Sequence, residues 1–279
     1  MKKTLMFMLG LCLAVQIVAA GKPKGKLFII GGGKRPDAMV NRMIDEAGIR
    51  TTGYVIILPM ASELADSAVI WSSEQFIKMG ISRISGINFK AGELPRMSAL
   101  DSVRHASLIY ISGGDQSRFM KAVQGTPIFD AIHQAYQDGA VIAGTSAGAA
   151  VMSHRMITGN ELRHPVYHET FQTIESRNIE FEPGLGLLEN VFIDQHFVVR
   201  SRYNRLVTAV LENPTNIGIG IDEATALVVK GKHAEVTGTS QVLVFRNRGK
   251  SVVSPEGKLG HARIDLEIYL PGDRFRIQK

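Results

Sequence analysis

Over the first half of the chain, short apolar runs alternate with segments of helical periodicity. Buried strands are predicted at 27–30, 54–58, 108–111 and 141–143, with a weaker candidate at 84–89. Helices are predicted at 36–47, 65–79 and 128–137. The strand runs are continuously apolar, which is typical of strands buried on both faces of a sheet. The pattern therefore predicts an α/β fold with a mainly parallel sheet and helices on both faces.

Between Arg155 and Pro183 this alternation breaks, and the chain becomes polar and charged. We interpret this stretch as an insertion that borders the functional site. A strand at 191–193 and a helix at 199–211 are predicted to resume the sheet, and short strands follow at 217–221, 226–229 and 242–245. Because the connections are short, we expect one domain over 21–279 that ends in β-hairpins.

The N-terminal segment has the layout of a secretory signal peptide. Lys2 and Lys3 precede an apolar run from Leu5 to Val15, and small residues stand before Gly21. The run is too short for a membrane span, although an uncleaved anchor is the alternative. We expect residues 1–20 to be removed and the protein to be exported, to the periplasm or outside the cell, with no membrane association afterwards.

Composition narrows the possible partners and chemistry. The formal net charge is +6, aromatic residues make up 7% of the chain, and no dense lysine or arginine stripe occurs, so nucleic acid is not an expected partner. Cys12, the one cysteine of the chain, lies in the predicted signal peptide. The mature protein would therefore have no disulfide, no thiol nucleophile and no thiolate metal site.

A serine flanked by glycines follows the predicted strand at 141–143. The run Gly144-Thr145-Ser146-Ala147-Gly148 fits the Gly-x-Ser-x-Gly nucleophile elbow, which needs a strand before it and a helix after it. Small neighbours permit the tight turn, which projects the serine oxygen from the carboxyl edge of the sheet. N–H groups at the start of the helix can stabilise an oxyanion. A phosphate-binding loop or a packing turn is the alternative.

A nucleophilic serine needs a base and an acid that orients the base. His196 follows the predicted strand at 191–193, at the same carboxyl edge where Ser146 is expected. The other histidines stand in helical, hairpin or insertion settings, where a structural or surface role is the default. Four carboxylates follow predicted strands, and spacing alone does not choose among them: Asp115, Asp194, Asp222 and Glu223.

Five motifs along the chain resemble one known family. They read GTSAGAAVMS at the elbow, ISGGDQ at 111–116, GLGLL at 184–188, DQHFVVRSRYNRL at 194–206 and GIGIDEATALVV at 218–229. In this order they are similar to the cyanophycinases, which are serine peptidases of the peptidase E-like group. The resemblance covers about Lys26 to Phe245. It implies a flavodoxin-like core of the class I glutamine amidotransferase type.

The resemblance implies roles for individual residues. Ser146 would be the nucleophile, His196 the base and Glu223 the acid that orients the histidine. The oxyanion hole would consist of the backbone N–H groups of Gly114 and Ala147. Three further residues would line the substrate site: Gln116, Asp194 and Gln195. The order Ser-His-Glu along the chain differs from that of the α/β-hydrolases, which argues against a lipase or esterase.

Three arginines closely follow the candidate base: Arg200, Arg202 and Arg205. Such a run is usually a solvated helix face. A β-linked aspartyl substrate, however, carries an α-carboxylate near the scissile bond, and arginine binds carboxylates through two parallel hydrogen bonds. The resemblance therefore favours a substrate contact for at least one of the three. The arginine of the substrate would need a carboxylate, for which the insertion offers Glu161, Glu169 and Glu175.

The implied reaction is hydrolysis of cyanophycin, a poly-aspartate that carries arginine on its β-carboxyls, to β-aspartyl-arginine. The resemblance also implies a homodimer, and it implies no metal and no organic cofactor. The segment at 154–183 differs from the shorter glycine-rich stretch of cytoplasmic members, so the preference between the polymer and small peptides stays open. A peptidase E-like aspartyl or isoaspartyl dipeptidase is the nearest alternative. A non-catalytic protein that binds an anion at Ser146 is a second.

Overall fold

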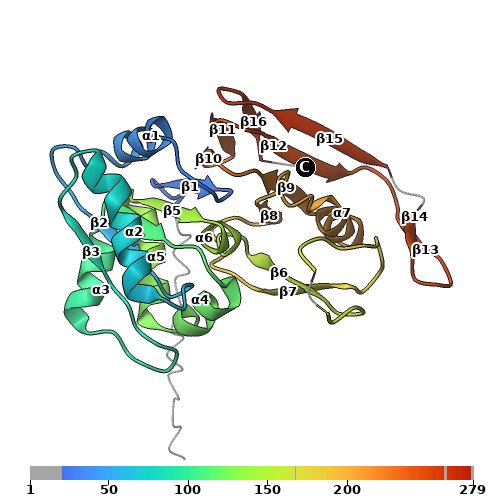
Figure 1. The fold of residues 1–279 in the computed structure, drawn as a ribbon, viewed down its shortest axis with the longest axis horizontal. Helices are drawn as coiled ribbons and strands as arrows, with labels where there is room; N and C mark the ends of the chain where they lie inside the picture. The colour runs from blue at the N-terminus through green and yellow to red at the C-terminus, as the bar shows by residue number, and fades with distance from the viewer. Residues whose placement is uncertain (1–20, 167, 261–262, 278–279) are drawn as a thin grey trace, which may run out of the picture.

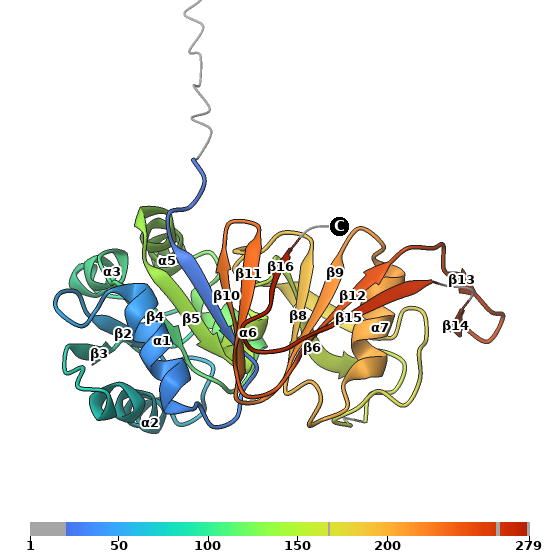
Figure 2. The ribbon, with the colours of Figure 1, turned by 90° about the horizontal axis from the view of Figure 1, so that it is seen from above.

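The computed structural model describes residues 21–166, 168–260 and 263–277. The signal peptide predicted over 1–20 lies outside the described residues. The views in Figures 1 and 2 show the N-terminal strands and most helices in one half of the molecule. The other half contains β8 (Val191–Gln195), β9 (Ile217–Ile221), β12 (Val242–Asn247), β15 (Ile264–Tyr269) and α7 (Tyr203–Glu212). Within the described ranges, no helix combines the length and the apolar character that a membrane crossing requires.

The larger sheet contains the predicted parallel core. Its strand order is β16-β11-β10-β1-β5-β4-β2-β3. Five neighbouring strands are parallel: β1 (Lys26–Ile30), β5 (Val141–Thr145), β4 (Leu108–Ile111), β2 (Val55–Leu58) and β3 (Ile84–Gly86). Antiparallel strands extend the sheet beyond β1: β10 (Thr225–Lys230), β11 (His233–Gly238) and β16 (Arg274–Arg276). The predicted α/β class with a mainly parallel sheet is confirmed.

Helices cover both faces of this sheet, because successive residues of a strand point to opposite sides. On β1, Phe28 and Ile30 pack with Met43, whereas Leu27 belongs to the core that contains Ile132. One face carries α1 (Asp37–Ala47) and α2 (Ala65–Lys78). The other carries α3 (Met97–Arg104), α4 (Gln116–Val123), α5 (Pro127–Asp138) and α6 (Ala147–Ala150). The apolar pattern did not predict α3 and α4, which are only eight residues long.

The strand predicted at 191–193 does not continue the larger sheet. It is part of β8 (Val191–Gln195), which belongs to a separate sheet of order β15-β12-β9-β8. Its other members are β9 (Ile217–Ile221), β12 (Val242–Asn247) and β15 (Ile264–Tyr269). The physical reason is that β1 already pairs with β5 on one side and with β10 on the other, so no edge beside β1 is open. Val191 and Ile193 nevertheless join the core of the larger sheet.

The helix predicted at 199–211 begins later than expected, because α7 spans Tyr203–Glu212. Ser201 has a φ of 47°, which lies outside the helical region, and turns occupy residues 197–202. α7 covers the outer face of the second sheet, where Phe192 and Leu206 pack. The chain after β8 therefore turns tightly before the helix, and the candidate base lies in that turn.

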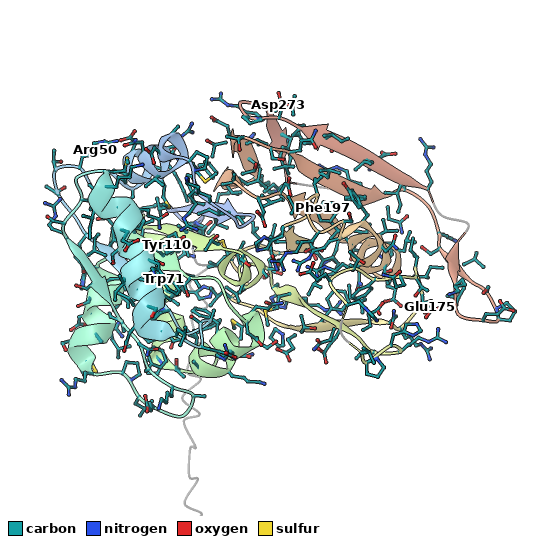
Figure 3. The ribbon with its side chains drawn as sticks, in the orientation of Figure 1. Arg50, Trp71, Tyr110, Glu175, Phe197 and Asp273 are labelled. Carbon is teal, nitrogen blue, oxygen red and sulfur yellow. The ribbon has the colours of Figure 1, made fainter. Side chains whose placement is uncertain are left out.

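The segment at 155–183 contains a hairpin of β6 (Arg155–Glu161) and β7 (Ile179–Pro183). Between these strands lies Glu175, which is buried and forms ion pairs with His164 (2.9 Å) and Lys258. Lys258 precedes β14 (Leu259–Gly260), which pairs with β13 (Val252–Val253). The insertion is therefore held against the C-terminal hairpin, at the position of Glu175 in Figure 3.

Candidate active site

Five strand ends meet where the two sheets adjoin. They contribute Gly31–Gly33 after β1, Gly113 after β4, Ser146 after β5, His196 after β8 and Glu223 after β9. Two backbone hydrogen bonds join the sheets here: the His196 N–H donates to the Gly31 carbonyl (2.7 Å), and the Ala224 N–H donates to the Gly32 carbonyl (3.0 Å). The carboxyl ends of parallel strands are where ligands bind in open α/β sheets. In this chain, two sheets share one such edge.

Ser146 occupies a strained turn directly after β5. Its φ is 52° and its ψ is −113°, a combination that costs a non-glycine residue about 1–3 kcal/mol. The surrounding backbone holds this geometry, because the Ser146 N–H donates to the Ile30 carbonyl (3.1 Å) and the Ala149 N–H donates to the Ser146 carbonyl (2.9 Å). The turn points the side chain out of the sheet. The helix that follows, α6, has only four residues.

Ser146, His196 and Glu223 form one hydrogen-bonded chain. Nε2 of His196 lies 2.9 Å from Oγ of Ser146, and Nδ1 of His196 lies 2.5 Å from Oε1 of Glu223. With Nδ1 as the donor to the carboxylate, Nε2 of the neutral imidazole is free to accept the serine proton. The arrangement has the roles of a nucleophile, a base and an acid that orients the base.

The structure distinguishes the four carboxylates that spacing left open. Asp194 pairs with Arg205 through a hydrogen bond from Nε to Oδ2 (2.6 Å). Asp222 accepts the N–H groups at the start of the turn after His196, and Asp115 caps α4 by accepting the Arg118 N–H (2.9 Å). The oxygens of each of these three carboxylates are therefore already bound to a group other than His196. Glu223 is the carboxylate that reaches the imidazole.

Two glycines that follow β1, Gly32 and Gly33, lie directly against the side chains of His196 and Glu223. A Cβ on Gly32 would lie 2.3 Å from Cε1 of His196, and a Cβ on Gly33 would lie 2.6 Å from Oε2 of Glu223. Both residues also have positive φ, of 116° and 68°. Any side chain at either position would overlap the base or its acid. The signal in the sequence is the triple glycine at the end of a buried strand.

Burial and neighbouring charges set the proton affinity of His196. Burial of the imidazole lowers the pKa of His196 below its ordinary value of 6.5, and the positive charges of Arg200 and Arg202 lower it further. The hydrogen bond to Glu223 acts in the opposite direction. The net direction is downward, so the imidazole stays neutral to lower pH than an exposed histidine. A neutral imidazole is the form that can act as a base.

This arrangement predicts the pH profile. The acidic limb of kcat/KM should follow the pKa of His196 and lie below 6.5. Replacement of Arg200 by glutamine removes a positive charge, so the pKa should rise and the acidic limb should move to higher pH. The measurement is kcat/KM against pH for the wild type and Arg200→Gln. Arg248→Gln, a half-exposed arginine paired with Asp265, is the control and should leave the limb in place. An unchanged limb in Arg200→Gln would contradict the prediction.

The candidate oxyanion donors flank Ser146. Ala147 opens α6, where the first N–H groups of a helix have no intrahelical acceptor. A Cβ on Gly113 would lie 3.4 Å from Cβ of Ser146, so the Gly113-Gly114 turn runs directly beside the nucleophile. Gly114 has a φ of 138°, which a residue with a side chain rarely adopts. One expected donor, Ala147, is thus the residue after Ser146, and the other, Gly114, belongs to the turn that passes beside it.

The predicted substrate residues differ in how accessible they are. Gln116 is 8% exposed, and its amide donates to the carbonyls of Ile157 (3.0 Å) and Thr158 (2.6 Å). Gln195 accepts a hydrogen bond from the Arg202 guanidinium (2.8 Å), and Arg202 is 4% exposed. Gln195 also accepts a hydrogen bond from Oγ of Ser146 (3.4 Å), so it joins Arg202 to the serine, whereas the Gln116 amide is bound to the backbone of β6.

Asp194 and Arg205 lie deeper still, where the resemblance placed substrate contacts. They are 0% and 3% exposed and bind each other through two hydrogen bonds.

Removal of one partner from a buried pair leaves the other charge uncompensated, at a cost of about 3–5 kcal/mol. Arg205→Met should therefore lower the free energy of unfolding by that amount, as measured by chemical denaturation. Arg200→Met, which removes a more exposed arginine, is the matched control. Similar losses in both variants would contradict a special role for the buried pair.

Arg200 is the most exposed of the three arginines after the base. Its guanidinium lies 3.6 Å from Oε1 of Glu169, which is mostly exposed. Of the other carboxylates in the insertion, Glu161 accepts a hydrogen bond from Asn178 (3.0 Å). Lys258 and His164 hold the pKa of Glu175 at about 2, so this carboxylate is already bound as an anion. Glu169 is thus the freest of the three candidates for a substrate cation.

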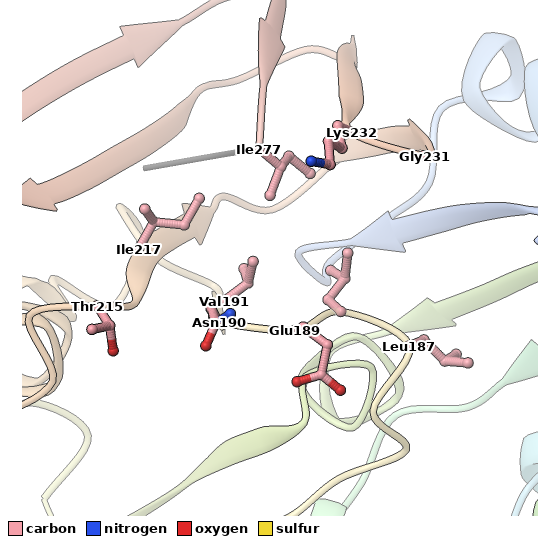
Figure 4. A pocket seen from close by; sticks show the side chains of 10 residues that line it. Leu187, Glu189, Asn190, Val191, Thr215, Ile217, Gly231, Lys232 and Ile277 are labelled. Carbon is pink, nitrogen blue, oxygen red and sulfur yellow. The ribbon is translucent and has the colours of Figure 1, made fainter. Parts of the chain in front are cut away.

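Cavities lie at both ends of the strands. A cleft of about 310 Å³ is lined by Ser146, His196, Gly32 and Gly33, among other residues. Figure 4 shows another cavity, of about 400 Å³, lined by Val191 and other residues at the amino ends of β8 and β9, away from the triad edge. In the described part of the chain, no group of three histidine, cysteine or acidic side chains is placed to hold a metal ion.

Comparison with known proteins assigns this site to a family. The sequence profile of peptidase family S51 matches residues 27–237. The chain belongs to peptidase family S51. A cyanophycinase from Nostoc sp. is 31% identical over 268 residues, which cover 91% of this chain and 86% of the relative. A peptidase E from Actinobacillus pleuropneumoniae is 27% identical over 159 residues, which cover 53% of this chain and 61% of the relative.

A solved structure shows the same fold. The crystal structure of a peptidase from an acI-B1 Actinobacterium aligns with a TM-score of 0.66 at 23% sequence identity, over 92% of this chain and 98% of the other. Membership of family S51 makes the protein a serine-type peptidase. The predicted resemblance to cyanophycinases and peptidase E is thereby confirmed.

Proposed function

We propose that this S51 peptidase hydrolyses cyanophycin through a triad of Ser146, His196 and Glu223. The observation that carries the proposal is the unbroken hydrogen-bonded chain from Oγ of Ser146 to the carboxylate of Glu223. The similarity over 91% of the chain to a cyanophycinase supports the choice of substrate.

The chemistry follows from this geometry. Oγ of Ser146 attacks a backbone carbonyl of the poly-aspartate while Nε2 of His196 takes its proton. The N–H groups of Gly114 and Ala147 stabilise the oxyanion. His196 then protonates the leaving amine, and an acyl-enzyme remains on Ser146. Water, deprotonated by His196, attacks the acyl carbon and releases the second product with Ser146 restored.

The substrate contacts divide by exposure. Arg200 is partly exposed, so we assign to it a substrate carboxylate, with Glu169 beside it for the substrate arginine. Asp194 and Arg205 are buried, and Gln195 lies between Arg202 and Ser146. We therefore assign to Asp194, Gln195 and Arg205 the positioning of the wall behind the nucleophile.

The test is to incubate the protein with purified cyanophycin and to follow soluble products by mass. We expect release of β-aspartyl-arginine. Protein treated beforehand with a serine-reactive phosphonate should release none, and the label should be found on Ser146. If the untreated protein releases nothing from the polymer, cyanophycin is not the substrate.

An aspartyl or isoaspartyl dipeptidase is the second candidate, because a peptidase E is 27% identical over about half of the chain. The same preparation, incubated with α- and β-aspartyl dipeptides, separates the two. Rapid cleavage of dipeptides with no action on the polymer would favour this candidate. Both outcomes leave the family assignment and the triad geometry unchanged.

We also propose that residues 1–20 direct export. The support is the charged start, the short apolar run and the small residues before Gly21. Expression in a bacterial host followed by fractionation should place the protein outside the cytoplasm, with an N-terminus at Gly21 by mass spectrometry. Recovery of the full-length chain from the cytoplasm would contradict the proposal.

A further inference from the structure

The cleft beside the triad has one wall that the proposed mechanism does not use. This wall is formed by Arg35 from the loop after β1, Trp71 and Ser72 from α2, and Tyr110 and Ser112 from the end of β4. We call it the Arg35 wall. In Figure 3, Trp71 is labelled on α2 and Tyr110 on β4, the strand behind this helix. Ser146 and His196 line the same cleft, so any group bound there lies next to the reacting carbonyl.

Arg35 is held in place by neutral acceptors. Its Nε donates to Oε1 of Gln75 (2.5 Å), and a terminal nitrogen donates to the Gly33 carbonyl (3.3 Å). In the described ranges, no carboxylate lies within ion-pair distance of its guanidinium, whereas many other arginines of the chain pair with one. Gly33 lies against the side chain of Glu223, so this hydrogen bond places Arg35 close to the triad. The site thus presents a fixed positive charge with unused donors.

A buried hydroxyl adds a second polar group to the wall. Tyr110 is 0% exposed, and its phenol oxygen has no hydrogen-bond partner among the described residues. Its ring is held by an edge-to-face contact with Phe76, at 5.7 Å between centroids. Buried hydroxyls in proteins are nearly always hydrogen-bonded, so an unpaired one in a cleft wall points to a ligand. A phenol at neutral pH can donate to an anion.

The charge of the lining selects the ligand. The residues that line the cleft include Arg35, hydroxyl groups and backbone, but no aspartate or glutamate. Such a surface attracts a carboxylate and repels a guanidinium. The exposed indole of Trp71, 59% exposed at the edge of the cleft, offers a flat face to a planar cation that extends outwards. A carboxylate inside the cleft and a cation at its edge are the two charged groups of an arginyl residue whose α-amine forms the link to the substrate.

We propose that the Arg35 wall is a specificity subsite for the α-carboxylate of a β-linked arginyl residue next to the scissile bond. The proposal rests on cyanophycin as the substrate, and it adds the residue that recognises one group of that substrate. Arg35 binds the carboxylate through its two-pronged guanidinium, in the cleft that Tyr110 also lines. Arg200 and Glu169 remain available to the neighbouring residue of the polymer.

The test compares two synthetic aspartyl oligomers of equal length, one with β-linked arginine and one with β-linked argininamide. The wild type should prefer the free acid by about 10- to 100-fold in kcat/KM, as expected for loss of a charged hydrogen-bonded pair. Arg35→Met should remove that preference by slowing only the acid, and Arg35→Lys should keep part of it. Arg50→Met, which removes an exposed arginine paired with Asp45, is the matched control.

Binding to the inactive Ser146→Ala variant separates this proposal from the proposed function. Calorimetry should show tighter binding of the acid than of the amide, and the double variant with Arg35→Met should bind both equally. If the wild type cleaves neither oligomer, the substrate assignment fails, while the binding preference still tests the wall. Equal binding of acid and amide by Ser146→Ala, or no binding of either, overturns the proposal. An equal loss of activity on both oligomers in Arg35→Met also overturns it.

Discussion

Replacement of Ser146 by alanine is expected to lower kcat by about 10⁴-fold or more and to leave substrate binding nearly unchanged. Oγ of Ser146 is the hydroxyl oxygen that Nε2 of His196 contacts, at 2.9 Å. The alanine loses the nucleophile and the partner of Nε2. The oxyanion donors remain, so residual hydrolysis should not fall to zero.

The measurement is single-turnover hydrolysis of an aspartyl substrate, together with the affinity for that substrate. Alanine is tolerated sterically at this position, although the positive φ of 52° is as strained for alanine as for serine. Thermal unfolding should therefore be close to that of the wild type. A variant that keeps a tenth of the wild-type kcat would exclude Ser146 as the nucleophile.

Replacement of Gly32 by alanine is expected to lower kcat by about 10³-fold, because the new methyl group would overlap the imidazole of His196. The clash distance is 2.3 Å, which requires the ring or the strand end to move. Movement of the ring breaks its contact with Ser146, its contact with Glu223, or both. Misplacement by about 1 Å can already cost 10²-fold in rate.

Gly139→Ala is the matched control, because both glycines have strongly positive φ but only Gly32 faces the triad. Gly139 has a φ of 126°, against 116° for Gly32, and the nearest atom to a Cβ there is Cβ of Lys24 at 3.9 Å. Both variants should lose stability through backbone strain, and only Gly32→Ala should lose activity per folded molecule. Active-site titration with a serine-reactive phosphonate, normalised to folded protein, measures this. Equal activity losses would mean that strain, and not the clash, is responsible.

The strands and the elbow could be predicted from the sequence, because their signals are local. β1, β2, β4 and β5 are short, continuously apolar runs, and such runs are buried between helix layers whatever lies elsewhere in the chain. Ser146 stands between glycines at the end of one run, so its position at the carboxyl edge follows from the direction of the strand. His196 follows β8 in the same way. The α/β class and two residues of the candidate triad therefore needed no tertiary information.

Spacing along the chain did not choose among the four candidate acids, and before the structure only the family resemblance favoured Glu223. Asp115, Asp194, Asp222 and Glu223 all follow strands, and the number of residues between them and His196 says nothing about which one reaches the ring. The backbone after β9 decides it: Asp222 turns toward the N–H groups of Val198 and Val199, and the next residue then faces His196. Glu223 and Ala224 form the turn after β9, so the direction of the Glu223 side chain is set by that turn.

The division into two sheets was also invisible in the pattern of residues. β8 and β9 are as apolar and short as β4 and β5, so periodicity alone places them all in one sheet. Pairing is decided by which strand edges are free, and β10 returns from far along the chain to occupy the free edge of β1. Sheet pairing between distant segments depends on the whole chain at once.

The burial of each arginine after His196 also depends on tertiary contacts. Arg200, Arg202 and Arg205 look alike in sequence, but the turn at Ser201 places Arg205 inward against Asp194 and leaves Arg200 partly exposed. The sequence by itself thus determined the fold class, the nucleophile elbow and the candidate base, since each depends on neighbours within a few residues. Only the tertiary structure showed the contact between Glu223 and the imidazole, the glycines that make room for these side chains and the different burial of the three arginines, because each depends on which distant segments share a surface.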